Sequence, residues 1–291
     1  MTGRTGVRGW MGRLHGVLRG APVLATLLVA LFVLAAASAP WIAPHDPAGQ
    51  NFLAALAPPF WEGEGSLANP LGGDNRGRDI LSRIIYGARL SLVISVFAIA
   101  LAGGVGVLLG LLAGYAGGAI DALVMRIVDA FLAMPFILMA LGFVAALGPS
   151  VTNIIIVMGI TNWARYARLV RGEVLSVKSR DFVALARVAG QPPWRIGVKH
   201  ILPNVTNSII VLATLDLGRV IILESSLSFL GLGVQPPDIS WGLMLADGRA
   251  YMTVAWWLMV MPGMAILLAV LSLNIFGDWL RDRLDPRQAR D

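Results

Sequence analysis

The chain has 291 residues, of which 57% are hydrophobic and 14% charged, and its mean hydropathy is +0.74. Soluble domains have about 45–50% apolar and about 25% charged residues, so this composition excludes an ordinary soluble domain as well as a disordered chain. The lack of cysteine excludes disulfide-stapled scaffolds, thiol nucleophiles and thiolate zinc sites, and a net charge of +6 fits a polytopic membrane protein.

The first apolar run, Val23–Ala43, follows a tail that contains four arginines and no acidic residue. A basic tail, an apolar stretch and the small residues Ala37–Ala39 are also typical of a secretory signal peptide. Cleavage after these residues would leave Pro40 at the new terminus, and the apolar run continues long enough to span a bilayer. The segment is therefore predicted to be an uncleaved membrane anchor rather than a signal peptide.

Five further apolar runs follow, so we predict an all-α polytopic membrane protein with six transmembrane helices. A helix of about 20 residues crosses the hydrocarbon core of a bilayer. The later runs are Leu90–Gly114, Ala122–Leu147, Thr152–Ala164, Val205–Leu223 and Val254–Phe276. The run Thr152–Ala164 is short and leads directly into arginines, whose long side chains can reach the interface.

Lysine and arginine residues gather in the segments that six spans place on one side of the membrane. Sixteen of the 23 lie in the two tails and in the loop 165–204, which alone has eight, and five lie in the outer segments. Cytoplasmic segments carry an excess of basic residues, so both termini are predicted to be cytoplasmic. This bias also explains the pI near 10.4 without nucleic acid as a partner.

The predicted spans divide the chain into consecutive parts. Residues 1–43 form the cytoplasmic tail and first anchor, 44–89 an external loop region, 90–278 the transmembrane core with a cytoplasmic loop 165–204, and 279–291 a cytoplasmic tail. Aromatic rings in the external loop either rest at the lipid headgroups or belong to a small packed cap. No internal repeat stands out, which disfavours carriers built from two inverted halves in one chain.

Small residues recur along one face of the second predicted span. Gly106, Gly110 and Gly114 follow at four-residue spacing. Because small side chains let helix backbones approach closely in lipid, this stripe predicts a helix-packing face. Glycine is also common in membrane helices generally, and the stripe indicates nothing about a substrate.

The loop between the fourth and fifth predicted spans has the pattern of a helical hairpin. Asp181 is a candidate N-cap for a helix Phe182–Ala189, and Gly190 follows at the position where glycine often ends a helix. Pro193 can open a second short helix, because its missing N–H is not needed there. That helix is predicted to stop before Pro203.

The second helix of this hairpin combines apolar and basic side chains. Trp194 and Ile201 lie on its apolar face, and Arg195 and Lys199 lie beside that face. Such a helix suits insertion into a groove on a partner protein. A basic amphipathic helix on anionic lipid has the same pattern, so the two interpretations remain open here.

The spacing of this loop resembles the EAA loop of bacterial ABC importer permeases, whose pattern is Glu-Ala-Ala, three residues, Gly and then Leu-Pro. In that family the loop is the coupling helix that docks into an ATP-binding subunit. The resemblance therefore implies that the residues contacting the ATPase subunit are Ala184, Leu185, Ala186, Gly190, Arg195, Leu202 and Pro203. Ala184 departs from the family's usual Glu and Leu185 from its usual Ala, so the first position carries no implied polar contact.

A wider resemblance covers most of the chain and points to the C-type subunits of the dipeptide/oligopeptide permeases. The segments that carry it are Trp41–Pro44, Leu71–Asp79, Gly87–Leu92, Arg126–Asp129, Leu227–Gly233, Gln235–Pro237 and Gly277–Asp282. This resemblance implies the transmembrane domain of a type I ABC importer in the bacterial cytoplasmic (inner) membrane. It also implies three kinds of partner, namely a B-type second permease subunit, two ATP-binding subunits and an extracytoplasmic peptide-binding protein.

No phosphate-binding G-x-x-x-x-G-K-[ST] string occurs in the chain, so it is not expected to hydrolyse ATP itself. We expect no cofactor on this chain and no catalytic residues, with ATP and Mg²⁺ bound by the ATPase partners. The family's cargoes include dipeptides, longer peptides and nickel chelates, and the sequence does not choose among them.

Three acidic residues fall within or beside the predicted spans and are candidates for a translocation path or gate. They are Asp129, Asp216 and Glu224. Arg126 and Arg219 lie three residues from Asp129 and Asp216, so each pair can neutralise itself on one helix face. Structural pairing is favoured over substrate contact for these two, and Glu224 is the better candidate for lining the path.

Two other classes of function remain as alternatives. An ion-coupled secondary transporter without ATPase subunits would need carboxylates at the bilayer midplane, for which Asp129 and Asp216 are the candidates. A membrane enzyme is less favoured, because His15, His45 and His200 are scattered and predict no metal site or catalytic triad.

Overall fold

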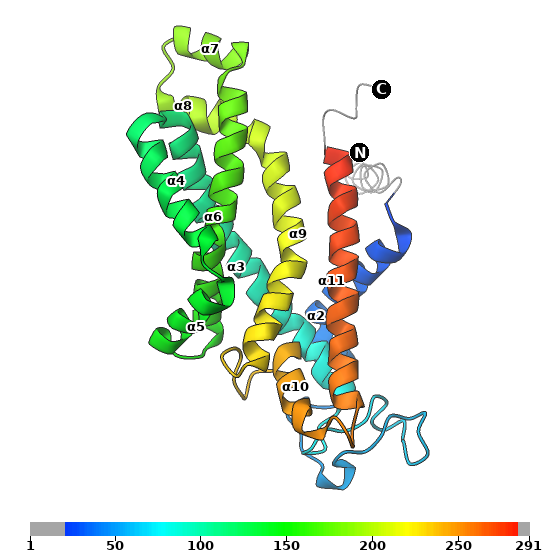
Figure 1. Ribbon diagram of the computed structural model, residues 1–291. Coiled ribbons are helices and arrows are strands. Elements are labelled where there is room, and N and C mark those ends of the chain that lie inside the picture. The colour runs from blue at the N-terminus through cyan, green and yellow to red at the C-terminus, as the bar shows by residue number, and fades with distance from the viewer. Residues whose placement is uncertain (1–20, 285–291) are drawn as a thin grey trace, which may run out of the picture.

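The structure is a computed structural model that describes residues 21–284 (Figure 1). In this range it is helical, and its only β-type pairing is one bridge between Gly73 and Asp79. The elements are α2 (Val23–Ile42), η1 (Phe52–Ala54), α3 (Ile80–Ala116), α4 (Gly118–Ala133), α5 (Phe136–Leu147), α6 (Val151–Lys178), α7 (Asp181–Val188), α8 (Pro193–Ile196), the π-helical turn η2 (Gly197–Ile201), α9 (Leu202–Phe229), α10 (Trp241–Gly248), η3 (Arg249–Tyr251) and α11 (Trp257–Leu284). The basic amino-terminal tail, His15 and the last seven residues of the predicted carboxyl-terminal tail lie outside the described residues.

The long helices run between two ends of the molecule (Figure 1). The α7–α8 hairpin and the carboxyl end of α11 lie at one end, and α10 with the loop between α2 and α3 lies at the other. The hairpin loop and the end of α11 are thus on the same side, as the charge distribution predicts. We call the hairpin end the inner end and the opposite end the outer end.

The all-α fold is confirmed, whereas the count of six spans is not. In the described part of the chain, four helical stretches are long and apolar enough to cross a bilayer, namely α2, α3, Pro193–Phe229 and α11. The helix α2 matches the predicted first anchor to within one residue. The helices α4 and α5 qualify together as a fifth, broken span.

The span predicted over Ala122–Leu147 is not one continuous helix, because α4 and α5 are bent by 95° at the break between them. Met134 ends α4 in an extended conformation (φ −85°, ψ 133°), and Pro135 follows. The proline ring disfavours helical geometry at the residue before it. Helix α5 then turns away from the direction of α4 at the outer end (Figure 1).

Helix α6 extends far beyond the short span predicted at Thr152–Ala164, so the first third of the predicted cytoplasmic loop is helical. It runs unbroken over 28 residues to Lys178. Because polar and charged side chains interrupt its apolar stretch, it is not among the helices apolar enough to span by composition.

Helix α3 begins ten residues before the predicted Leu90, so Arg83 and Arg89 belong to a helix and not to the external loop. The Asp79 carboxylate caps this helix by accepting a hydrogen bond from the Ser82 N–H at 2.8 Å. At the other end of the chain, α11 continues to Leu284, past the predicted boundary at 278.

The hairpin forms as predicted at its turn but not at its ends. Gly190 has φ +72°, as the prediction of a glycine-ended helix requires. Asp181 is the first residue of α7 and not its N-cap, which is Arg180. The second helix does not stop before Pro203, because η2 joins α8 to α9 as one helical stretch. The wider π turn spares the proline the clash that it would make in a regular α-helix.

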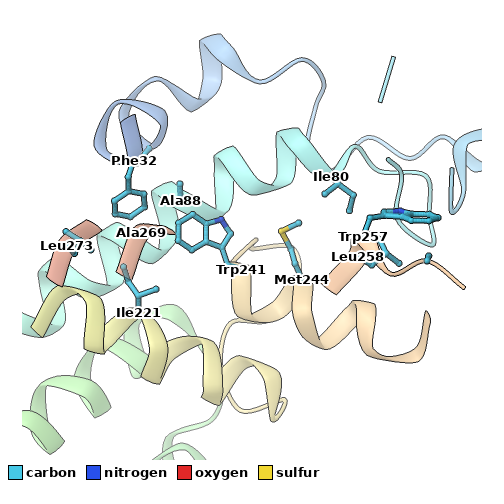
Figure 2. Close-up of a cluster of buried hydrophobic side chains, with 12 residues drawn as sticks. Phe32, Ile80, Ala88, Ile221, Trp241, Met244, Trp257, Leu258, Ala269 and Leu273 are labelled. Carbon is cyan, nitrogen blue, oxygen red and sulfur yellow. The ribbon is translucent and has the colours of Figure 1, made fainter. Parts of the chain in front are cut away.

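A buried apolar cluster at the outer end joins five helices (Figure 2). Trp241 of α10 lies at its centre, with its ring centroid 5.5 Å from that of Phe32 and its N–H donated to the Ile84 carbonyl at 2.9 Å. Trp257 similarly donates its N–H to the Gly73 carbonyl at 3.2 Å. Sequence patterning missed α10, although this cluster makes it part of the core.

The external loop is partly packed and partly exposed. Asp74 is buried and accepts hydrogen bonds from the backbone of Arg76 and Arg78. The buried Arg83 guanidinium lies 3.8 Å from Asp74 and 3.6 Å from Asp247 of α10. These ion pairs join the loop, α3 and α10 into one cap, from which Phe52 projects with 72% of its surface exposed.

Candidate functional site

Three arginines on one side of α6 pair with aspartates from neighbouring helices. Arg165, Arg168 and Arg171 are three residues apart, which places them along the same side of a helix. Their respective partners are Asp216 of α9 and then Asp129 and Asp121 of α4. We call this row of ion pairs the arginine ladder. It joins α6 to both helices that flank it.

The two rungs nearer the inner end are balanced pairs. Arg171 donates two hydrogen bonds to Asp121, at 2.8 and 2.7 Å, in the bidentate geometry that suits a guanidinium and a carboxylate. Asp129 pairs with Arg168, and both side chains are more than half exposed. The expected partnership of Asp129 with Arg126 on its own helix is therefore wrong.

The third rung is unbalanced, because two arginines share one acid. Asp216 is buried, with 3% of its side chain exposed, and it contacts both Arg165 and Arg219. The expected pair of Asp216 and Arg219 is confirmed at 3.7 Å, and Arg219 also donates to the Asn162 side-chain oxygen at 3.2 Å. Arg165 and Arg219 remain 34% and 39% exposed.

Glu224 lies on α9 two turns nearer the outer end, where it has no exposed surface in this chain. Its carboxylate accepts a hydrogen bond from the Ser228 hydroxyl at 2.7 Å. The same hydroxyl accepts the Val234 N–H at 3.0 Å, which ties the loop after α9 to the helix. Of the three acids expected at a path, Glu224 and Asp216 are thus both buried in this chain, whereas Asp129 is exposed.

The glycine stripe of α3 lies against α6. A β-carbon at Gly106 would lie 2.5 Å from the Trp163 carbonyl oxygen, and one at Gly110 would lie 2.5 Å from the Ala167 carbonyl oxygen. A β-carbon at Gly114 would lie 2.8 Å from Val174. Since side chains would clash at all three positions, the close approach of the two helices requires these glycines.

The hairpin presents an apolar outer surface on a buried base. Val183, Ala186 and Ile196 are buried against α6 and the start of α9. Its exposed apolar side chains include Phe182, Leu185, Val188, Trp194 and Val198, and Ala184, Arg195 and the charged residues Asp181, Arg187 and Lys199 are exposed beside them. Of the remaining coupling residues predicted from the sequence, Gly190 and Pro203 are exposed and Leu202 is half-buried.

The turn of the hairpin is held by two backbone hydrogen bonds. The Gly190 N–H donates to the Arg187 carbonyl at 2.9 Å, and the Gln191 N–H donates to the Ala186 carbonyl at 3.1 Å. Together they make the Schellman ending of α7, for which a residue at positive φ is needed. The His200 ring and the Gln191 side chain, 2.9 Å apart, connect this turn to η2.

A groove of about 690 Å³ opens near the inner end between α6, α9 and α11. Its lining includes Leu169 and Glu173 of α6, Asn207 and Leu215 of α9, and Arg281 of α11. Glu173 accepts a hydrogen bond from the Ser208 hydroxyl at 3.0 Å within it. Within residues 21–284, no group of three or more His, Asp or Glu side chains is arranged to hold a metal ion.

Sequence reasoning missed Asp121 and Asn162 as members of the polar network. The three-residue spacing of Arg165, Arg168 and Arg171 was the available signal, because such spacing puts the three charges on one helix side and calls for acids opposite. Which acids lie opposite depends on how α4, α6 and α9 pack.

Residues 106–290 match the family described as "Binding-protein-dependent transport system inner membrane component". The chain is 45% identical over 263 residues to the di/tripeptide transport system permease protein DppC of Pseudomonas aeruginosa, with 90% of this chain and 86% of that protein covered. It is 46% identical over 270 residues to the dipeptide transport system permease protein DppC of Escherichia coli K12, with 92% and 89% covered. It is also 39% identical to the probable D,D-dipeptide permease DdpC of E. coli K12, with 94% and 91% covered.

A solved structure of the MetNI methionine ABC transporter shares the fold. Its chain aligns with a TM-score of 0.57 at 16% identity and covers 69% of this chain and 96% of its own length. That structure shows an inward-facing conformation of the transporter. At this identity the likeness concerns the helical architecture alone.

Proposed function

This chain belongs to the family of binding-protein-dependent transport system inner membrane components, and we propose that it carries dipeptides and related short peptides as a permease subunit of an ABC importer. The observation that supports this cargo is the 45% identity over 90% of the chain to a di/tripeptide permease. The same relatives favour a permease over the ion-coupled secondary transporter considered from the sequence.

The α7–α8 hairpin is the proposed contact with an ATPase subunit. Trp194 and Leu185 expose 69% and 68% of their surfaces, and Val188 exposes 86%. Exposed apolar residues in such a cluster favour a protein partner. The buried base formed by Val183 and Ile196 supports a rigid hairpin, which a transmission element requires.

The path from this hairpin into the membrane is one continuous helical stretch. Residues Pro193–Phe229 run without interruption from the hairpin to the outer end. Asp216 and Arg219 lie on this stretch and contact α6. A displacement of the hairpin would therefore be carried along this stretch, past the arginine ladder, to the outer end. Alternating access follows if the ATP-bound and ATP-free partners favour two packings of these helices.

The complete transporter is proposed to contain a second, B-type permease subunit, two ATP-binding subunits that hold ATP and Mg²⁺, and an extracytoplasmic peptide-binding protein. The family description, which names binding-protein-dependent transport, supports this composition. Since permease subunits are not enzymes, hydrolysis is assigned to the partner chains.

Reconstitution tests this function directly. The chain would be placed in liposomes with the B-type subunit and both ATP-binding subunits, and uptake of a radiolabelled dipeptide would be measured with the binding protein outside and ATP inside. Uptake is expected to require ATP, the binding protein and this chain. Uptake by this chain alone, driven by an ion gradient, would contradict the proposal.

A further inference from the structure

The unbalanced rung of the arginine ladder, Arg165, Asp216 and Arg219, lies about halfway along α6 and α9. Asp216 is in the middle of the 28-residue helix α9, about 21 Å along the helix from Leu202. Arg165 is likewise about 21 Å along α6 from Val151. A hydrocarbon core about 30 Å thick that is centred on these helices would enclose the rung.

This rung carries a surplus positive charge. Within residues 21–284, Asp216 is the only carboxylate that pairs with either Arg165 or Arg219. Arginine stays protonated and carries five N–H donors, so two guanidinium groups exceed what one carboxylate satisfies. The neighbouring rungs have one arginine for each aspartate and carry no such surplus.

The surplus charge is also accessible. The side chains of Arg165 and Arg219 are 34% and 39% exposed, whereas Asp216 is buried beneath them. An exposed surplus charge at this depth is too costly to face lipid, so this side of α6 and α9 faces water or a counter-ion. Arg219 Nη1 donates to the Asn162 side-chain oxygen at 3.2 Å and lies 3.7 Å from Asp216, and no contact of its Nε or Nη2 is among the hydrogen bonds and ion pairs of residues 21–284.

The groove at the inner end leads toward the same rung. Leu169 and Leu215 line the groove on α6 and α9, which run side by side (Figure 1). Arg165 precedes Leu169 by four residues, and Arg219 follows Leu215 by four. Residues four apart share a helix face, so both arginines continue the two walls of the groove one turn toward the outer end.

From these observations we infer that Arg165 and Arg219 form an anion site that binds the terminal carboxylate of a peptide as it crosses the membrane. This inference rests on the proposed peptide cargo. Every linear peptide has one such carboxylate whatever its side chains, and a guanidinium pair matches its two oxygens. The site would thus recognise peptides as a class without selecting their sequence. An acidic side chain of the second permease subunit is the competing counter-ion.

Cysteine labelling of the complete transporter tests the site, because this chain has no native cysteine. Leu169→Cys and Leu215→Cys each place one thiol a turn away from the rung. Each variant would be treated separately with an anionic and with a cationic methanethiosulfonate reagent. The labelling rate of each reagent would be divided by its rate with a free thiol in solution, and labelling would be detected as an increase in the mass of this chain. The anionic reagent is expected to react about tenfold faster than the cationic one. Adding Arg219→Gln should abolish most of that preference.

Protection by cargo identifies the ligand. Dialanine is expected to slow the anionic labelling, whereas its carboxyl-terminal amide should not. Three results would overturn the site. The first is that neither reagent labels either position, and the second is that both reagents label equally fast, because an acid of the partner subunit neutralises the rung. The third is that dialanine and its amide protect equally. ATP-driven dipeptide uptake is measured on the same preparation, so a transporter that works but shows one of these results contradicts only the carboxylate site.

Discussion

The Gln191 N–H donates to the Ala186 carbonyl at 3.1 Å and closes the turn between α7 and α8. Gly190 lies between these two residues with φ +72°. The turn fixes how the exposed edge of α7 is presented relative to α8.

Gly190→Val is expected to uncouple ATP hydrolysis from transport. A β-branched residue at this φ costs about 1–2 kcal/mol, and no atom lies within 4 Å of the added β-carbon, so the effect is purely conformational. In reconstituted transporter, peptide uptake should fall several-fold more than ATPase activity. Gly231→Val is the matched control, because Gly231 has φ +78°, equally open surroundings and the same pair of turn hydrogen bonds, but follows α9 at the outer end. Normal coupling in Gly190→Val would show that the hairpin turn does not transmit the signal.

Trp194→Ala is expected to weaken the binding of the ATP-binding subunits. Truncation of an exposed tryptophan at the centre of an interface costs about 2 kcal/mol or more, which is about 30-fold in Kd. Affinity of the purified permease for the ATPase subunits would be measured in detergent. Trp61→Ala is the control, since Trp61 is likewise an exposed tryptophan, at 48%, but lies in the external loop. If instead Trp194→Ala binds the ATPase normally and loses affinity for anionic vesicles, the hairpin is a lipid-surface helix.

Gly110→Ala is expected to destabilise the protein by about 1–3 kcal/mol, because the new β-carbon would lie 2.5 Å from a backbone oxygen of α6. Gly104→Ala on the same helix meets nothing within 4 Å, and alanine's better helix propensity makes it neutral or stabilising by up to about 1 kcal/mol. The unfolding temperatures of the two variants, measured in detergent, test whether α3 and α6 pack this closely. Equal stability of the two would contradict this packing.

Trp241→Phe is expected to cost about 1 kcal/mol, since it leaves the Ile84 carbonyl without the indole N–H in a buried cluster. A loss of this size lowers the apparent Tm by about 2–4 °C in a chain of this length. Trp256→Phe is the comparison, because the Trp256 N–H donates to an exposed carboxylate of Glu62 that water can satisfy. A larger effect at Trp256 than at Trp241 would be inconsistent with the fold of the outer cluster.

Sequence patterning located most of the helices, and its errors have physical causes. The first anchor was predicted to within one residue because nothing polar interrupts it. The bend at Met134 and Pro135 was missed because averaging hydrophobicity over a window does not register a change of direction. The span predicted within α6 ends too early, because the three arginines that follow it are typical of a solvated loop. In the structure they pair with acids on other helices.

Local geometry could be predicted more readily than pairing. Gly190 was placed correctly because a left-handed residue after a helix depends only on its immediate neighbours. The partner of Asp129 was assigned to its own helix, yet it is Arg168 of α6. Tertiary packing decides whether an aspartate pairs with an arginine of its own helix or of another helix. The spacing of residues along one helix holds no information about that packing.

The uninterrupted stretch Pro193–Phe229 has a mechanical consequence. Its 37 residues make a rod about 55 Å long, with Trp194 at one tip and Glu224 near the other. A tilt of about 5° about its centre would move each tip by about 2.5 Å in opposite directions, which follows from that length alone. Small motion of an ATPase subunit at the inner tip would thus displace the outer tip by more than the tolerance of a hydrogen bond, while Asp216, near the fulcrum, would hardly shift.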